Sequence, residues 1–194
     1  MRDIIKTTIP LFVICIVTGL CLSYVNSITK APIARRIMEA SELKKAEVLK
    51  EAQSFTELKI PEKISGKNNI ITAAFKGVNS GKTAGFVFNV SPKGYGGPID
   101  VTVGIGVDGS VTGVKLGENK ETPGLGTKAA EAPFITQYGG KNIKAIFELV
   151  KKPPAGNQIQ AISGATISSR AVNSAVQAAA DCAKELIKAE AVNK

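Results

Sequence analysis

The chain has 194 residues, a formal net charge of +9 and no histidine, so it lacks the commonest general base and metal ligand. Its cysteines, Cys15, Cys21 and Cys182, form no CxxC or other cluster spacing, which argues against iron–sulfur clusters, structural zinc and a disulfide framework, and any redox chemistry would need an organic cofactor. Lys and Arg are scattered and aromatic residues make up only 5%, which favours a solvated basic surface over a nucleic-acid partner.

The N-terminal segment predicts a membrane anchor. From Ile9 to about Ile28 the chain carries no charged residue, and about 20 such residues at roughly 1.5 Å each span the hydrocarbon core. Cleavable signal peptides have shorter apolar cores, and Leu20 occupies the position before Cys21 where a lipoprotein site needs a small residue. We therefore expect an uncleaved single-pass anchor over residues 1–30. Basic residues flank both of its ends, so the positive-inside rule does not decide the orientation.

A spacer is expected next, over residues 31–62. The stretch from 31 to about 58 is rich in Glu, Lys and Ala and predicts a helix with a modest apolar face at Ala40, Val48, Ala52 and Phe55. Pro61 and the turn-forming run Ser65–Asn69 then predict a boundary. The domain proper is expected over residues 63–194.

This domain is predicted to be α+β, with an antiparallel sheet packed by helices. Strands are expected at Ile70–Phe75, Gly85–Val90, Ile99–Val107, Val111–Leu116 and Ala145–Lys151. Asp108 and Gly109 predict a tight hairpin turn between the third and fourth strands. A C-terminal helix, capped by Ser168 or Ser169, is expected to bury a stripe made of Val172, Val176, Ala179, Ala183 and Leu186 or Ile187.

The run Ser163–Ser169 stands at the start of this helix and combines small residues with several hydroxyls. The first turn of a helix presents unpaired N–H groups and a partial positive charge, so it favours a phosphate. The hydroxyl of Thr166 has no base beside it in the sequence, so it is a weak nucleophile.

Three runs in order, Gly94–Ile99, Glu121–Gly126 and Ser163–Thr166, resemble the FMN-binding subunits of Rnf and Na⁺-pumping quinone reductase complexes. The resemblance covers about residues 85–190, and the compact length with one anchor is most similar to the RnfG type, since the NqrC type is longer. In this family the threonine hydroxyl is esterified to the phosphate of FMN. A separate Mg-dependent transferase delivers the FMN from FAD. The matching position is Thr166.

The resemblance implies a set of cofactor-binding residues. Gly164 and Ala165 would leave room for the phosphate or ribityl chain, and N–H groups and hydroxyls near Ser168 and Ser169 would hold the phosphate. The loop 121–126 would form a wall against the isoalloxazine ring. The residues expected at the site are Thr166, Ser163, Gly164, Ala165, Ser168, Ser169, Glu121, Thr122, Gly124, Leu125, Gly126, Lys128 and Tyr95, with Glu121, Thr122 and Lys128 as hydrogen-bonding groups. No metal ligand and no catalytic residue is expected.

The implied function is that of an electron-transfer flavoprotein anchored in the cytoplasmic (inner) membrane, with its soluble domain on the extracytoplasmic side. It would relay electrons through covalent FMN in an Rnf-type translocase that couples ferredoxin:NAD electron transfer to Na⁺ or H⁺ transport. Its partners would be the other membrane and redox subunits and the FAD-dependent transferase, and it would turn over no substrate alone.

Two alternatives stay open. One is a flavin subunit of a related quinone reductase or extracellular reductase. The other is a membrane-tethered scaffold with a vestigial flavin site. It is suggested by Gln160, which stands where the attachment motif often has an acidic residue.

Overall fold

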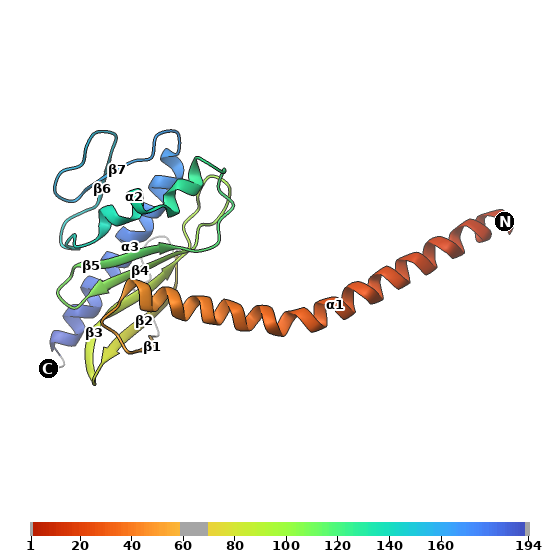
Figure 1. Ribbon diagram of the computed structural model, residues 1–194, viewed down its shortest axis with the longest axis horizontal. Helices are drawn as coiled ribbons and strands as arrows, with labels where there is room; N and C mark the ends of the chain where they lie inside the picture. Colours follow the sequence, from red (N-terminus) through yellow and green to blue (C-terminus); the bar gives the residue numbers. More distant parts are fainter. Residues whose placement is uncertain (1, 59–69, 193–194) are drawn as a thin grey trace. The chain divides into compact units, whose positions relative to one another are not determined.

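The computed structural model describes residues 2–58 and 70–192 (Figure 1). The chain divides into two compact units, Met1–Leu43 and Lys44–Lys194, which are described separately. The predicted boundary residues Pro61 and Ser65–Asn69 lie outside the described residues, as does the expected domain start at residue 63.

Helix α1 runs without interruption over Arg2–Val48, with Pro10 and Pro32 inside it. Among the described residues it is the one helix long and apolar enough to cross a membrane, by length and composition. Three of its hydroxyls are bonded within the helix: Thr18 and Thr29 donate to carbonyls one turn earlier, each at 2.8 Å, as does Ser27. Such back-bonding removes the cost of placing a hydroxyl in an apolar medium.

The predicted spacer helix to about residue 58 is wrong at its C-terminal end. Helix α1 stops at Val48, and Ser54–Leu58 forms strand β1, which pairs antiparallel with β2. The change begins where the Gln53 N–H donates to the Val78 carbonyl at 2.9 Å, a sheet contact that replaces the helical one. Phe55, expected on a helix face, instead packs as a strand residue against a small cluster around Val87.

The sheet has five strands in the order β1-β2-β3-β4-β5, and every neighbouring pair is antiparallel (Figure 1). After β1 come β2 (Ile71–Asn79), β3 (Lys82–Val90), β4 (Val101–Gly106) and β5 (Val111–Leu116). The predicted β4–β5 hairpin is confirmed. At its turn the Asp108 carboxylate accepts from the N–H and hydroxyl of Ser110, at 3.0 and 2.8 Å, which lowers the pKa of Asp108.

One face of the sheet packs on helix α3 (Thr166–Val192) and forms the main core. The predicted stripe is confirmed: Val172, Val176, Ala179 and Ala183 are buried, and Leu186 and Ile187 pack partly buried beside them. The predicted alternation from Ile99 into β4 as far as Ile105 also points into this core. Val107 does not continue it, because it lies in the turn and is 47% exposed.

The other face receives residues 44–52, which belong to the same compact unit. Val48 and Leu49 are fully buried against four glycines, one from each of strands β2 to β5: Gly77, Gly85, Gly104 and Gly113. A Cβ at any of them would collide with or press on this segment. The Thr112 hydroxyl donates to the Val48 carbonyl, and Lys115 pairs with Glu47 at 2.7 Å, which lowers the pKa of Glu47.

Between β5 and α3 the chain forms a lobe of short elements beside the β5 edge of the sheet (Figure 1). They are η1 (Gly126–Ala130), α2 (Ala132–Ile135), η2 (Thr136–Tyr138), β6 (Glu148–Val150) and β7 (Gln158–Gln160). The strand predicted over Ala145–Lys151 is shorter than expected and pairs in parallel with β7, which was not predicted, rather than with the main sheet.

Tyr138 anchors the lobe on helix α3. Its ring is fully buried between Phe134 and Phe147 in edge contacts with centroids 5.9 Å apart, and burial raises the pKa of its phenol. Its hydroxyl donates to the side chain of Asn173 at 3.3 Å, and the Asn173 amide donates to the Phe147 carbonyl at 2.8 Å. These contacts fix the first turns of α3 against the lobe.

Candidate functional site

Helix α3 begins at Thr166, earlier than predicted. Ser168 and Ser169 therefore lie in its first turn and do not cap it. Ser169 closes the turn instead: its hydroxyl donates to the Ala165 carbonyl at 2.9 Å and accepts the Ile162 N–H at 3.0 Å. The first intrahelical bond runs from the Ser169 N–H to Ala165, so the N–H groups of residues 166–168 have no partner within the helix.

The bend that leads into the helix depends on Gly164. Its φ of +78° is a left-handed conformation that other L-residues adopt only with strain. A Cβ there would also lie 3.2 Å from the Leu125 side chain, so the bend rests against the loop that contains residues 121–126. Two runs that are far apart in sequence thus meet at the helix N-terminus.

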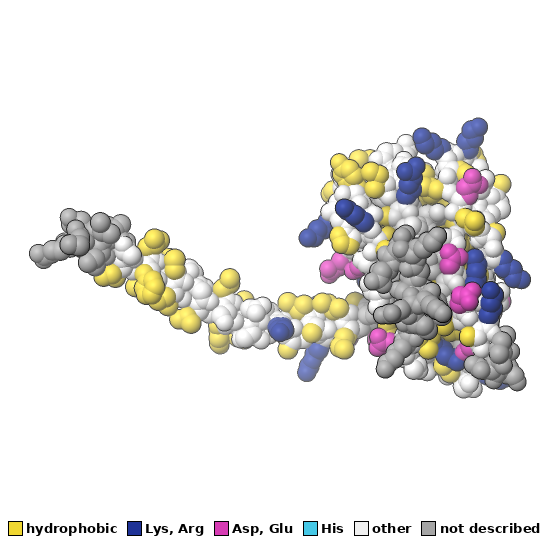
Figure 2. Space-filling model, turned by 180° about the vertical axis from the view of Figure 1, so that it is seen from behind, with side chains coloured by type: hydrophobic (Ala, Val, Ile, Leu, Met, Phe, Trp, Pro, Cys, Tyr) yellow, Lys and Arg dark blue, Asp and Glu magenta, His cyan; other side chains and the backbone are white. Residues whose placement is uncertain are grey.

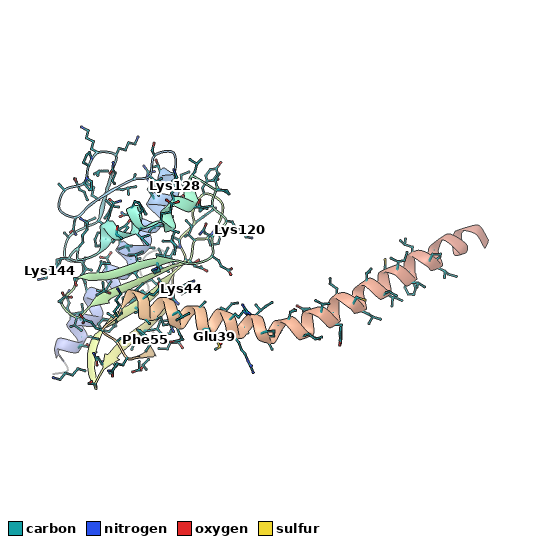
Figure 3. The ribbon with its side chains drawn as sticks, in the orientation of Figure 1. Glu39, Lys44, Phe55, Lys120, Lys128 and Lys144 are labelled. Carbon is teal, nitrogen blue, oxygen red and sulfur yellow. The ribbon has the colours of Figure 1, made fainter. Side chains whose placement is uncertain are left out.

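The loop 121–126 is held by hydrogen bonds of its own. The Thr122 carbonyl accepts the N–H groups of Leu125 and Thr127 at 3.2 and 3.3 Å, and the Thr127 hydroxyl accepts the Gly124 N–H at 3.0 Å. Lys120 and Lys128 flank this loop in the chain (Figure 3). The loop therefore presents a defined wall.

Glu121 connects the run Gly94–Ile99 and its own loop to the first turn of helix α3. Its side chain is buried, one carboxylate oxygen accepts the Gly96 N–H at 2.9 Å, and the other accepts the Ser168 hydroxyl. Close packing makes this possible: a Cβ at Gly126 would lie 2.8 Å from the Ser168 hydroxyl oxygen and nearer still to the carboxylate. At Gly96 a Cβ would overlap the Lys120 carbonyl.

These contacts enclose a cleft of about 530 Å³, a size typical of small-molecule and cofactor sites. It is lined by Tyr95, Glu121, Thr122, Leu125, Gly126, Gly164, Ala165, Thr166, Ile167 and Ser168. Three of these residues expose large apolar or aromatic side chains: Tyr95 (71%), Leu125 (43%) and Ile167 (51%). The cleft thus combines an apolar rim, suited to a planar ring, with a helix N-terminus, suited to a phosphate.

Most of the predicted site residues line this cleft, and four do not: Ser163, Ser169, Gly124 and Lys128. Lys128 lines a second groove, of about 200 Å³, together with Glu131 and Gln160. Glu121 lines the cleft, and its two carboxylate oxygens accept hydrogen bonds from the Gly96 N–H and the Ser168 hydroxyl. Ile167 was missed, and its only signal is a large apolar side chain in the first turn, outside the core stripe of α3.

The hydroxyls of the run Ser163–Ser169 differ in their contacts. Those of Ser168 and Ser169 are engaged, whereas those of Ser163 and Thr166 have no hydrogen-bond partner in the part of the chain that the structure describes. Of these two, only Thr166 lines the cleft. The residues present therefore fit a flavin nucleotide whose phosphate lies at the start of α3.

The fold and the cleft define a flavin-nucleotide-binding domain, and residues 94–181 match the FMN-binding domain family. The chain is 33% identical over 185 residues to the G subunit of the Na⁺-translocating ferredoxin:NAD⁺ oxidoreductase complex of Acetobacterium woodii, covering 90% of this chain and 89% of that protein. It is 33% identical to the G subunit of the ion-translocating oxidoreductase complex of Methanosarcina acetivorans, covering 93% and 94%. The chain belongs to this family of G subunits of ion-translocating oxidoreductase complexes.

A solved structure supports the fold. The crystal structure of Shewanella oneidensis NqrC superposes with a TM-score of 0.54 and 24% identity, over 72% of this chain and 73% of that one. The predicted α+β fold, with an antiparallel sheet packed by helices, is thus confirmed.

Proposed function

We propose that this chain is the G subunit of a membrane complex that couples electron transfer between ferredoxin and NAD⁺ to Na⁺ or H⁺ translocation, and that it carries FMN covalently on Thr166. The relatives named for ferredoxin:NAD⁺ complexes are 32–33% identical over nine-tenths or more of this chain, which favours this reading over a quinone reductase component. The observation that carries the attachment is the unpartnered Thr166 hydroxyl in the cleft.

Attachment forms a bond between Thr166 Oγ1 and the phosphorus of the FMN half of FAD. It breaks the pyrophosphate bond, releases AMP, and passes the hydroxyl proton to a base. The chain has no histidine, so we assign that base and the Mg²⁺ to a separate FAD-dependent flavin transferase. The contribution of this chain is to present the hydroxyl at the first position of α3.

Each part of the cleft has a distinct role toward the bound cofactor. The free N–H groups at the start of α3 would hold the phosphate, and the engaged serines hold that first turn in place. The exposed side chains of Leu125, Tyr95 and Ile167 at the cleft would cover the ring and shield it from water. When bound, FMN supplies the one- and two-electron chemistry that the side chains of this protein lack.

A covalent tether suits a carrier that exchanges electrons with different subunits, because the cofactor cannot dissociate between partners. Helix α1 anchors the chain in the cytoplasmic membrane, and we place the domain on the extracytoplasmic side. On the face of the domain shown in Figure 2, Lys and Arg side chains are spread among acidic ones over the surface. We accordingly propose protein subunits and the membrane as its partners.

In-gel ultraviolet fluorescence after denaturation tests the attachment, on protein produced with and without the transferase. We expect a fluorescent band only with the transferase and none for Thr166→Ala. Ser163→Ala is the matched control, since it removes the other unpartnered hydroxyl of the run and should keep the band. A band in Thr166→Ala would overturn the assignment, and its absence from wild type would favour the scaffold alternative.

A further inference from the structure

Glu121 is a buried carboxylate without a cationic partner. Its exposed fraction is 6%, and no Lys or Arg of the described residues lies within ion-pair distance of it. Its negative charge is stabilised by the Gly96 N–H, by the Ser168 hydroxyl and by the start of helix α3. It also lines the cleft that we assign to the flavin.

The geometry of this junction does not need the charge. A glutamine has the same length, and its carbonyl could accept the Gly96 N–H while its amide donates to the Ser168 oxygen. A buried charge costs more to desolvate than a buried amide. What a carboxylate adds at this position, compared with a glutamine, is therefore its negative charge, whose electric field acts on the cleft.

We propose that Glu121 is a positioning residue that joins the three walls of the cleft, and that its fixed charge also lowers the reduction potential of the flavin bound there. This inference rests on the proposed function, because it needs FMN in the cleft. The physical reason is Coulomb repulsion. Glu121 lines the cleft that would hold the flavin, so an added electron would share that cleft with a negative charge that no Lys or Arg of the described residues pairs with, and reduction would become less favourable.

The test compares midpoint potentials of the full-length flavinylated protein, by spectroscopic titration with dithionite and redox mediators. Glu121→Gln removes the charge and keeps the hydrogen bonds. Ser168→Ala removes one hydrogen bond and keeps the charge. Glu118→Gln is the matched control, because Glu118 is a carboxylate three residues earlier that does not line the cleft.

We expect the reduced-to-oxidised ratio at a fixed ambient potential to rise about tenfold in Glu121→Gln, which is about 30 mV for a two-electron couple. Ser168→Ala and Glu118→Gln should not raise it. A potential does not depend on the fraction of protein that carries flavin, so partial loading leaves the comparison intact. Glu121→Ala, which loses both hydrogen bonds, should exchange the Gly96 amide hydrogen faster, and this can be measured without flavin.

Three results would overturn the inference. One is a potential in Glu121→Gln equal to that of Glu118→Gln, and another is an equal rise in Ser168→Ala. The third is complete loss of flavin in Glu121→Gln, because a neutral isostere should preserve the cleft. Failure of the proposed function is seen separately, as wild-type protein without covalent flavin.

Discussion

The Thr112 hydroxyl on β5 donates a hydrogen bond to the carbonyl of Val48, the last residue of helix α1. A carbonyl at a helix C-terminus lacks an intrahelical partner, so this contact satisfies a group that would otherwise be buried and unpaired. It places the end of the helix directly on the sheet. The glycines beneath it allow the backbones to approach this closely.

The first prediction concerns those glycines. Gly104→Ala should lower the unfolding free energy by about 1–3 kcal/mol, because its Cβ would lie 2.6 Å from the Thr112 hydroxyl oxygen and would overlap the Val48 carbonyl. Thermal unfolding followed by circular dichroism measures the change. Gly139→Ala is the matched control, since a Cβ there meets only a carbonyl oxygen at 3.4 Å. Equal melting temperatures for the two variants would contradict this packing.

A second prediction concerns pH and the β4–β5 turn. The pKa of Asp108 is lowered in the folded state by its hydrogen bonds to Ser110, so the ionised form stabilises the fold. This contribution is present above the unfolded pKa of about 3.9 and is lost as pH falls through the lower folded value. Ser110→Ala removes the hydroxyl donor and should therefore reduce stability slightly at pH 7 and by less at pH 2, where the ionised form contributes less. Chemical denaturation at both pH values checks this, and an equal loss at both would contradict it.

The third prediction concerns Cys182, a residue of helix α3 whose burial in the core raises the pKa of its thiol to about 11. In a Cys15→Ser, Cys21→Ser background, iodoacetamide at pH 8 should label the native protein far more slowly than the urea-unfolded protein. Because the folded pKa is raised, the neutral thiol contributes stability below its unfolded pKa, and this is lost as pH rises toward 11. Rapid labelling of the folded protein would show that the thiol is accessible.

Local patterns predicted the β4–β5 hairpin because its alternating apolar residues and its Asp108–Gly109 turn are adjacent in the chain. Strand β1 could not be predicted in the same way. Its identity depends on pairing with β2, about twenty residues later, and its composition continues the charged stretch before it. Strand β7 was not predicted and β6 was predicted too long, because three-residue strands carry too few positions for a periodic pattern.

The site shows the same limit. The three runs were identified by resemblance, and small residues with hydroxyls indicated a helix start near Thr166. The cap was misjudged because a serine before an apolar stripe reads as a cap, whereas Ser169 reaches back to Ala165 from within the first turn. The bridge from Glu121 to Ser168 joins residues 47 positions apart, and no local pattern encodes it.

The fourth prediction concerns Gly126, where the two walls of the cleft, the loop 121–126 and the first turn of helix α3, touch. In Gly126→Ala the added Cβ would lie 2.8 Å from the Ser168 hydroxyl oxygen and would overlap the Glu121 carboxylate, so one of them must move. Because helix α3 is fixed on the lobe by the buried contacts of Tyr138 and Asn173, we expect the loop to move and the cleft to open. The content of covalent flavin should fall several-fold. The melting temperature should drop by a few degrees, which corresponds to a loss of ~1–3 kcal/mol in the free energy of unfolding.

Two measurements separate this local effect from general unfolding. Limited proteolysis should show faster cleavage in the loop 121–126 of Gly126→Ala, while the amides in the middle of α3 keep their wild-type hydrogen exchange. Gly139→Ala, in the lobe but away from the cleft, should match wild type in both flavin content and proteolysis. If Gly126→Ala carried the full amount of flavin with an unchanged loop, contact between the two walls would not be what shapes the cleft.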